Sequence, residues 1–329
     1  MSKTIFITGA NGFLGSRIVK MAIKKKYKVI GLVRKNSKLD NLKNLDVELC
    51  IGDIRQTDSF FSYLKKSQII FHVAADYRLW AKKKSEIYDT NVYGTENLLK
   101  AVVKSGEKKV IYTSSVATLG LENGKINDEN TPVDYKSMIG DYKKSKFIAE
   151  KIFQEYVNNK IIDGVIINPS SPIGPGDFKP TPTGQIILQM LNKKMPAYVD
   201  TGLNFVHVDD VAAGHFLALE KGRIGEKYIL GGENVMLKEF LDLISDYANL
   251  PKVTKKINSR YLYPFAYINE FFAYLVDHYS PMLTVDGLKM SKSQMFFSSE
   301  KAKKELGYRP RDIKDAIKDS VDWMKSKFF

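Results

Sequence analysis

Short apolar runs alternate with helical patterns along the first 170 residues of the chain. The apolar runs are 4–8, 28–33, 46–52, 69–75, 109–115 and 165–171. Helical patterns begin near residues 13, 59 and 91, and again at residue 141. Alternation of this kind predicts parallel strands that are covered by helices on both faces. We therefore expect an α/β fold built on a doubly wound parallel sheet.

The pattern changes after Pro169. Residues 170–184 are rich in proline and glycine, which predicts a loop at a domain junction. Residues 205–222 then return to a strand followed by a helix, and the rest of the chain mixes short strands and helices. We predict a first domain over 1–170, to which 205–230 return, and a smaller mixed α/β domain mainly over 171–329.

The composition is that of a folded globular protein, with 329 residues, 44% hydrophobic and 27% charged. The net charge of +14 raises the question of nucleic acid or an anionic membrane. The lysines are scattered and no nucleic-acid motif accompanies them, so we expect no nucleic-acid partner. A solvated basic surface and a weak attraction to acidic surfaces both stay open. Since Cys50 is the single cysteine and no signal-peptide or membrane-spanning pattern is visible, we expect a cytoplasmic protein without stable membrane insertion.

Three glycines, Gly9, Gly12 and Gly15, lie between the first apolar run and the first helix. Without side chains the backbone can turn tightly, approach a pyrophosphate and direct the N–H groups of the helix start at the anion. This context favours a Rossmann-type dinucleotide site over a ligand-free turn. We assign the same cofactor-binding role to the neighbouring Thr8, Asn11, Phe13 and Leu14.

The second apolar run ends at Arg34, where an NAD-binding fold places an acidic residue beside the adenosine ribose. A guanidinium can donate two parallel charge-assisted hydrogen bonds to the 2′-phosphate of NADP. We therefore expect NADP(H) as the preferred cofactor, with NAD(H) as the alternative. Lys35 and Lys38 add positive charge to the same segment.

Tyr142 and Lys146 are four residues apart on a predicted helix, so that they share one face. We expect the ammonium to lower the pKa of the phenol and make it a usable proton donor and acceptor. Ser115 follows the preceding strand, at the edge where parallel sheets place their sites, and could hydrogen-bond a carbonyl or alcohol oxygen.

These motifs together resemble a known family. The segments TGANGFLG, FHVAA, YTSS, YKKSK and FVHVDDVAAGH, in this order, are similar to those of the extended short-chain dehydrogenases/reductases. Further segments resemble the proteins labelled hopanoid-associated sugar epimerase, which are themselves close to dihydroflavonol-4-reductase. They are FHVAADYRLWA, YTSSVATLG, PIGPGDFKPTPTG, MPAYVDTGLNFVHVDDVAAGH and GRIGEKYILGGEN.

The resemblance implies a catalytic triad of Ser115, Tyr142 and Lys146, in which Lys146 also holds the nicotinamide ribose. It implies further cofactor contacts along the edge of the sheet. Those residues are Asp53 and Ile54 beside the adenine, Ala74, Ala75 and Thr113 along the dinucleotide, and Pro169 and Ser171 beside the nicotinamide. Asn91 is expected to support a water molecule or the active-site helix.

Two positions depart from the relatives. Nucleotide-sugar epimerases typically carry an arginine for the diphosphate before the HVDD segment, whereas this chain has Leu203 and Asn204. Plant flavonoid reductases carry an asparagine after the catalytic serine, where this chain has Gly120. Both a nucleotide sugar and a flavonoid are therefore doubtful substrates.

Other candidates are less specific. The four histidines, of which His72 has the pattern of a structural core residue, show no metal-ligand spacing, and we expect no metal. Asp209 and Asp210 are explained by capping and dipole stabilisation of the helix that follows them. We assign Asp76, Tyr77, Arg78 and Asn204, with Ser115, as substrate-contacting residues, although packing is an equal alternative for the loop after residue 75. The aromatic run 261–279 is consistent with core or subunit contact, with a pocket wall or with a membrane surface.

The sequence thus predicts an NADP(H)-dependent oxidoreductase that interconverts a carbonyl and an alcohol on a small molecule. A sugar epimerase or dehydratase with a retained NAD(P) cofactor, in hopanoid or isoprenoid metabolism, is the alternative within enzymes. A non-catalytic NADPH-binding regulator is the alternative of another class. A homodimer is consistent with all three.

Overall fold

The computed structural model describes residues 3–122, 124–276, 279, 281 and 283–329. Its centre is a seven-stranded sheet with the strand order β3-β2-β1-β4-β5-β6-β9, in which every neighbouring pair is parallel. The strands are β1 (Thr4–Thr8), β2 (Lys28–Val33), β3 (Glu48–Ile51), β4 (Ile69–His72), β5 (Lys109–Thr113), β6 (Asp163–Pro169) and β9 (Lys227–Leu230). The predicted doubly wound α/β sheet is confirmed.

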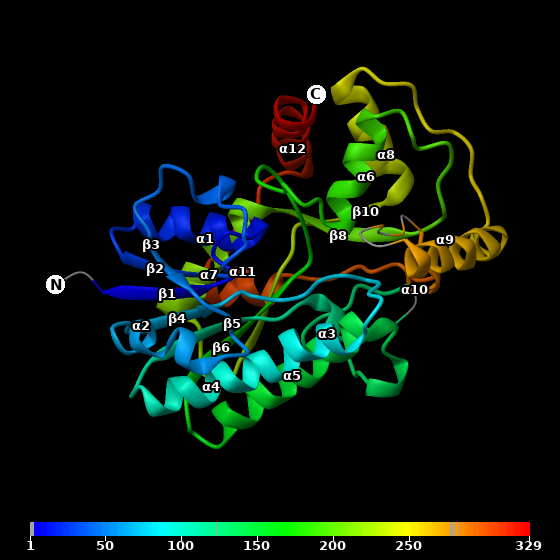
Figure 1. Ribbon diagram of the computed structural model, residues 1–329. Coiled ribbons are helices and arrows are strands. Elements are labelled where there is room, and N and C mark those ends of the chain that lie inside the picture. The colour runs from blue at the N-terminus through cyan, green and yellow to red at the C-terminus, as the bar shows by residue number, and fades with distance from the viewer. Residues whose placement is uncertain (1–2, 123, 277–278, 280, 282) are drawn as a thin grey trace.

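Helices cover both faces of this sheet (Figure 1). One face packs against α1 (Phe13–Lys24), α7 (Val208–Lys221) and α11 (Glu300–Leu306), and the other against α2 (Phe61–Lys65), α4 (Gly94–Lys104) and α5 (Gly140–Asn158). Each interface has its own buried apolar core, as the continuous apolar strands require. The sheet thereby presents its carboxyl edge, at which the strands lead into loops, as the place for a site.

A second unit lies beside that edge. It contains a three-stranded sheet, with the order β10-β8-β7, and an apolar core shared with three helices. Its elements are β7 (Ser171–Ile173), β8 (Gly202–His207), β10 (Glu233–Met236), α6 (Pro182–Leu191), α8 (Leu237–Ala248) and α12 (Ile313–Phe328). Two further helices, α9 (Tyr263–Leu275) and α10 (Val285–Met290), pack on each other at its outer side (Figure 1).

The chain crosses between the two units differently from the prediction. The start of the segment 205–230 belongs to the small sheet through β8, and the return to the large sheet is made by α7 and β9. The α11 helix also returns to pack on α7, which the sequence pattern did not indicate. The short elements include α3 (Ser85–Tyr88), a π-helical turn η3 (Asp89–Tyr93), and the 3-10 turns η1 (Asp40–Leu42), η2 (Thr57–Ser59), η4 (Val116–Thr118), η5 (Tyr135–Ser137) and η6 (Ser259–Leu262).

Candidate active site

The turn between β1 and α1 can accept a dinucleotide only because it is made of glycine. Gly9 has a φ of +68°, and a Cβ there would lie 2.9 Å from the Cα of Ala74. A Cβ on Gly15 would lie 2.1 Å from the carbonyl oxygen of Gly9. The first turn of α1 carries no acidic residue, so its N–H groups are directed at the loop without a competing carboxylate. This cradle, which a side chain would fill, fits a pyrophosphate.

The end of β2 places a cation where the sequence predicted one. Arg34 is exposed directly after β2, and its charge contributes to lowering the pKa of Asp53, although the hydrogen bond from Arg55 is the largest cause. The Asp53 carboxylate is held by the Arg55 guanidinium at 2.7 Å. The side chain of Ile54 is buried in the core against Gly94, whereas the carboxylate of Asp53 is partly exposed. Nearby, the Asn11 side chain donates to the Lys38 carbonyl oxygen at 3.1 Å, joining the two predicted cofactor segments.

The loop after β4 is fixed by buried polar side chains. The Thr8 hydroxyl accepts from the backbone N–H of Ala74 at 3.0 Å and bonds to His72 Nδ1 at 2.8 Å. The other ring nitrogen of His72 bonds to the Thr95 hydroxyl at 2.9 Å, and burial, followed by the charge of Lys146, lowers the pKa of His72 to about 3. His72 is therefore a neutral structural residue, as predicted. Of the other histidines, His278 lies outside the described residues.

Asn91 connects the same edge to the candidate catalytic helix. Its side-chain oxygen accepts from the N–H of Asp76 at 2.7 Å, and its amide nitrogen donates to the Asp76 carbonyl oxygen and to the Ser145 hydroxyl, both at 2.9 Å. Ser145 lies on α5, next to Lys146. Asn91 thus supports the helix in this structure, and its predicted contact with the cofactor stays a prediction.

The structure brings Ser115 and Tyr142 together at the carboxyl end of β5. Ser115 caps the turn η4, accepting from the Ala117 N–H at 3.1 Å, and it is close enough to the Tyr142 hydroxyl to influence the pKa of that phenol. Burial raises the pKa of Tyr142, and Ser115 opposes that shift. The expectation that Lys146 lowers the pKa of Tyr142 is therefore wrong for this structure. A tyrosine in this environment is a proton donor at neutral pH.

Lys146 is directed to β5 instead. Its ammonium donates to the Thr113 carbonyl oxygen at 2.8 Å and to the Tyr112 hydroxyl at 3.1 Å, and it lies 4.6 Å from the centroid of the Tyr112 ring. Burial lowers the pKa of Lys146 to about 7, and the charge of Glu150 opposes this shift. The hydroxyl of Thr113 is occupied by His215 at 2.9 Å, so only its backbone faces Lys146.

A buried polar network behind Ser115 was missed by the sequence reasoning. Glu150, one turn after Lys146, accepts from Ser114, Thr118 and Asn168 and forms an ion pair with Lys227. Asn168 also donates to the Ser115 carbonyl oxygen at 3.0 Å. The signal was present: Glu150 interrupts the apolar face that α5 buries, and Asn168 interrupts an apolar strand. This network fixes the backbone that carries Ser115.

The predicted substrate residues fall into two groups. Asp76 is close enough to Tyr142 for its charge to raise the pKa of the phenol, and it pairs with Arg78 at 2.6 Å. Tyr77 donates to the Lys179 carbonyl oxygen at 3.1 Å, which ties this loop to the small unit. Asn204 is buried, and its amide is used by Gly232, Asn234 and Phe297 within the protein. Its polar atoms thus have partners within the protein, and a substrate contact for Asn204 stays a prediction.

The structure shows the surroundings of Gly120 and Leu203, the two positions at which the sequence departs from its relatives. A Cβ on Gly120 would lie 2.0 Å from the Pro132 carbonyl oxygen, so that an asparagine could not stand there without displacing the loop. Leu203 packs against the apolar core of the small unit.

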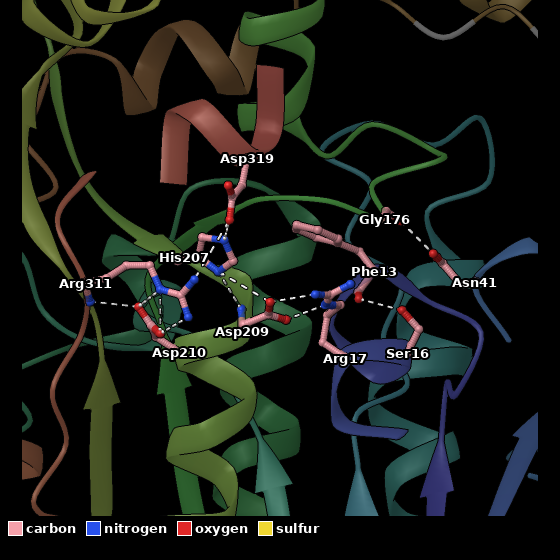
Figure 2. Close-up of polar contacts among 10 residues, drawn as sticks. All are labelled: Phe13, Ser16, Arg17, Asn41, Gly176, His207, Asp209, Asp210, Arg311 and Asp319. Carbon is pink, nitrogen blue, oxygen red and sulfur yellow. Dashed lines mark hydrogen bonds and ion pairs between the residues drawn. The ribbon is translucent and has the colours of Figure 1, made fainter. Parts of the chain in front are cut away.

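A second polar cluster, drawn in Figure 2, joins the glycine-turn helix to the small unit. Arg17 of α1 forms a bidentate pair with Asp209 of α7, and Asp210 pairs with Arg311 at 2.8 Å. The cap of α7 is His207, which accepts from the Asp209 N–H at 3.0 Å. Asp209 and Asp210 therefore act as salt-bridge partners in the first turn rather than as the cap.

Asn41 makes a similar link on the other side of α1. Its amide donates to the Asn11 carbonyl oxygen at 3.3 Å. It also donates to the Gly176 carbonyl oxygen at 2.8 Å (Figure 2). The glycine turn is thereby held by contacts from the loop that begins the small unit.

A family model described as "NAD dependent epimerase/dehydratase family" matches residues 5–231. The chain belongs to this family. It is accordingly an extended short-chain dehydrogenase/reductase, and the family is described as NAD dependent.

Individual relatives agree over the whole length. The chain is 40% identical to a putative dihydroflavonol 4-reductase of Synechocystis, covering 99% of this chain and 96% of that protein. It is 28% identical to sterol demethylase protein B of Methylococcus capsulatus, covering 98% and 99%. The solved structure of a protein named gox2253 matches with a TM-score of 0.88 at 46% identity, covering 99% and 98% of the two chains. A nucleoside-diphosphate-sugar epimerase of Pseudomonas aeruginosa, at 20% identity and a TM-score of 0.82, shares the fold.

Proposed function

We propose that the protein is an NADP(H)-dependent oxidoreductase that reduces a carbonyl group to an alcohol on a small molecule. The observation that carries the proposal is the position of Tyr142 beside Ser115 at the carboxyl end of β5, on the helix that also carries Lys146. Reduction of a carbonyl requires a proton for the oxygen, and a phenol whose pKa is raised by burial is present in the donor form.

Each residue has a stated task in this proposal. Ser115 hydrogen-bonds the substrate oxygen, Tyr142 delivers its proton, and Lys146 holds the ribose through hydrogen bonds from its amino group. Gly9, Gly12 and Gly15 with the start of α1 hold the pyrophosphate. The nicotinamide supplies the hydride when bound.

The assignment of NADP(H) depends on Arg34. Its guanidinium is exposed at the end of β2 and beside Asp53, whose carboxylate is already paired with Arg55. Because Asp53 is paired with Arg55, it attracts Arg34 less strongly. The Arg34 guanidinium can then bind a 2′-phosphate. A reductase draws on the reduced NADPH pool in each turnover, whereas an epimerase restores its cofactor, so this preference also favours net reduction.

The substrate class is narrowed by what the site lacks. The residue at the epimerase arginine position is Leu203, which lies in an apolar core, and Gly120 leaves no room for an asparagine. We therefore propose a carbonyl compound other than a nucleotide sugar or a flavonoid. Incubation with a panel of aliphatic and aromatic aldehydes and ketones, following NADPH absorbance, tests this. The Ser115→Ala variant should lose the activity, and an absence of turnover with every carbonyl would count against the proposal.

A further inference from the structure

The helix α9 presents an apolar face to solvent. Its side chains Phe265, Tyr267, Ile268, Phe271, Phe272, Tyr274 and Leu275 are each between 53% and 63% exposed. At about 100° of rotation per residue, these seven positions fill one continuous half of the helix. The opposite half buries Ala266 and Ala273, and Ala266 packs with Val285 and Leu288 of α10. We refer to the seven residues as the α9 face.

The α9 face is unlike an ordinary surface helix. Surface helices place charged residues on the side away from the core, whereas none of the seven side chains is charged. Exposed apolar side chains continue before and after the helix, at Tyr261, Val276 and Tyr279. Contiguous apolar surface of this kind marks a site of interaction with a protein or a membrane.

Cations border the α9 face. The ammonium groups of Lys82 and Lys292 lie 5.7 Å and 5.2 Å from the ring centroids of Tyr274 and Tyr263. Arg260 is exposed at the start of the helical segment. Of the described acids nearby, Asp286 is bonded to Lys289 at 3.1 Å, and Glu270 is half-buried and accepts from the Val285 N–H at 2.8 Å. Aromatic rings bordered by lysine and arginine match the headgroup region of an anionic bilayer.

We propose that the α9 face docks reversibly on the surface of an anionic lipid bilayer. The helix has 13 residues and is therefore about 20 Å long, which is too short for a span, so it would lie in the plane of the interface. No helix among the described residues is long and apolar enough to cross a membrane. Figure 1 places α9 at the outer edge of the molecule, away from the seven-stranded sheet, where a flat surface can reach it.

A second copy of the chain fits this face less well. A twofold contact through α9 would bring the bordering cations of both copies, including Arg260 and Lys292, toward one another. Like charges opposed across an interface weaken it, whereas anionic lipid headgroups attract the same cations. The chain as a whole carries a net charge of +14, which acts in the same direction.

Vesicle flotation tests the proposal. The full chain is mixed with phosphatidylcholine vesicles, with and without phosphatidylglycerol, at low and high salt. We expect the protein to float with the anionic vesicles and to be released by salt. The double variant Phe271→Glu and Leu275→Glu should lower the partitioning by about tenfold or more, because both changes place a carboxylate in the contact.

Ile161→Glu with Ile224→Glu is the matched control, since these residues are 48% and 55% exposed and the added charge is the same. This control should float like the wild type, and thermal unfolding should show that both double variants are folded. The proposal is overturned if the wild type fails to float with anionic vesicles at low salt, or if the control variant loses as much binding as the α9 variant. It is also overturned if the wild type forms a dimer that the α9 variant abolishes and neither of them binds vesicles. These outcomes are independent of which carbonyl the active site reduces.

Discussion

Two regions of the molecule place side chains in unfavourable surroundings, in opposite senses. At the carboxyl edge of the large sheet, Lys146 and Glu150 are charged residues in the interior. On the α9 face, seven apolar side chains stand in water. Both arrangements cost free energy in the isolated chain, because a buried ammonium loses hydration and an exposed ring orders water around it. Glu150 is compensated by its ion pair with Lys227. For Lys146 and for the α9 face we propose binding partners, a dinucleotide with its substrate at the edge and a lipid surface at α9.

The two regions differ in how they are held. The edge is fixed by hydrogen bonds from several strands and helices, for example from Asn168 to Glu150 and from Asn91 to Ser145. The α9 helix is held through a small cluster with α10. A rigid site suits chemistry that requires exact placement, whereas a peripheral helix suits a contact that needs only area and charge.

The largest effect at the candidate active site is expected from removing the hydroxyl oxygen of Tyr142. Tyr142→Phe should lower the turnover number by about 10²–10⁴, since general acid catalysis is lost. Dinucleotide affinity, measured by calorimetric titration, should remain because the ring stays. Tyr88→Phe is the control, because it removes a hydroxyl that bonds Asp141 on the same helix. Activity of Tyr142→Phe within about tenfold of the wild type would show that its assigned role is wrong.

The cost of burying Lys146 should be visible as a pH dependence of stability. Because the pKa of Lys146 is about 7 in the folded chain and 10.5 in the unfolded chain, the unfolded state binds more protons between these values. The free energy of unfolding of the cofactor-free wild type should therefore rise across this window. The rise should be at most about 5 kcal/mol relative to Lys146→Met, at about 1.36 kcal/mol per pKa unit. Denaturant titrations from pH 6 to above pH 10, buffered at roughly one-unit steps, measure it. Parallel curves for the two proteins would contradict a neutralised lysine.

The glycine turn can be broken with one methyl group. In Gly15→Ala the new Cβ would meet the Gly9 carbonyl oxygen, so helix α1 must move away from the turn. We expect the Kd of NADPH to rise about 100-fold, equivalent to about 2.7 kcal/mol. Gly106→Ala, whose Cβ would meet no atom within 4 Å but whose φ of +94° strains an alanine, should bind NADPH like the wild type once thermal unfolding shows that it is folded. Equal affinity in both variants would place the dinucleotide elsewhere.

Cofactor choice should change with Arg34. Arg34→Asp should raise the Kd of NADPH by about tenfold to 100-fold, since a charge-assisted hydrogen bond is worth about 1.5–3 kcal/mol. The Kd of NADH should change little or fall. Arg309→Asp makes the same charge change at another exposed position and should leave the preference intact. Unchanged NADPH affinity in Arg34→Asp would remove the basis for the NADP assignment.

The smallest expected effect is that of an α9 variant on the Kd of NADPH, and it tests whether the two regions act independently. The double variant Phe271→Glu and Leu275→Glu should leave the Kd of NADPH within about twofold of the wild type, because both side chains are exposed to solvent and substitutions at distant sites act independently. Calorimetric titration of the folded variant measures this. A large loss of NADPH affinity would show that α9 and the edge are one functional unit.

The sequence was informative where a pattern has one structural solution. Gly9, Gly12 and Gly15 predicted a turn that the structure forms with a positive φ at Gly9. Alternation of apolar runs and helices predicted the parallel sheet. Contacts between distant segments were not predictable in this way, because no local pattern pairs Arg17 with Asp209 or Glu150 with Lys227.

The sequence also could not predict which hydrogen-bond partners a particular side chain has in the fold. The spacing of Tyr142 and Lys146 correctly placed them on one helix, but it could not show that the ammonium donates to Thr113 and Tyr112. That choice is made by burial, which depends on how β5 and α5 pack. Asn204 illustrates the same limit, because its side-chain amide is hydrogen-bonded to Gly232 and Asn234, which follow β9.

The central claim is net reduction by NADPH, and product stoichiometry tests it most directly. Purified protein is incubated with NADPH carrying deuterium at the transferred position and a carbonyl substrate from the panel, and separately with nucleotide sugars and catalytic NADP. Our account predicts that deuterium appears in the alcohol in equal amount to the NADPH consumed, and that the nucleotide sugars are unchanged. Epimerised or dehydrated sugar formed without net consumption of NADPH would contradict it.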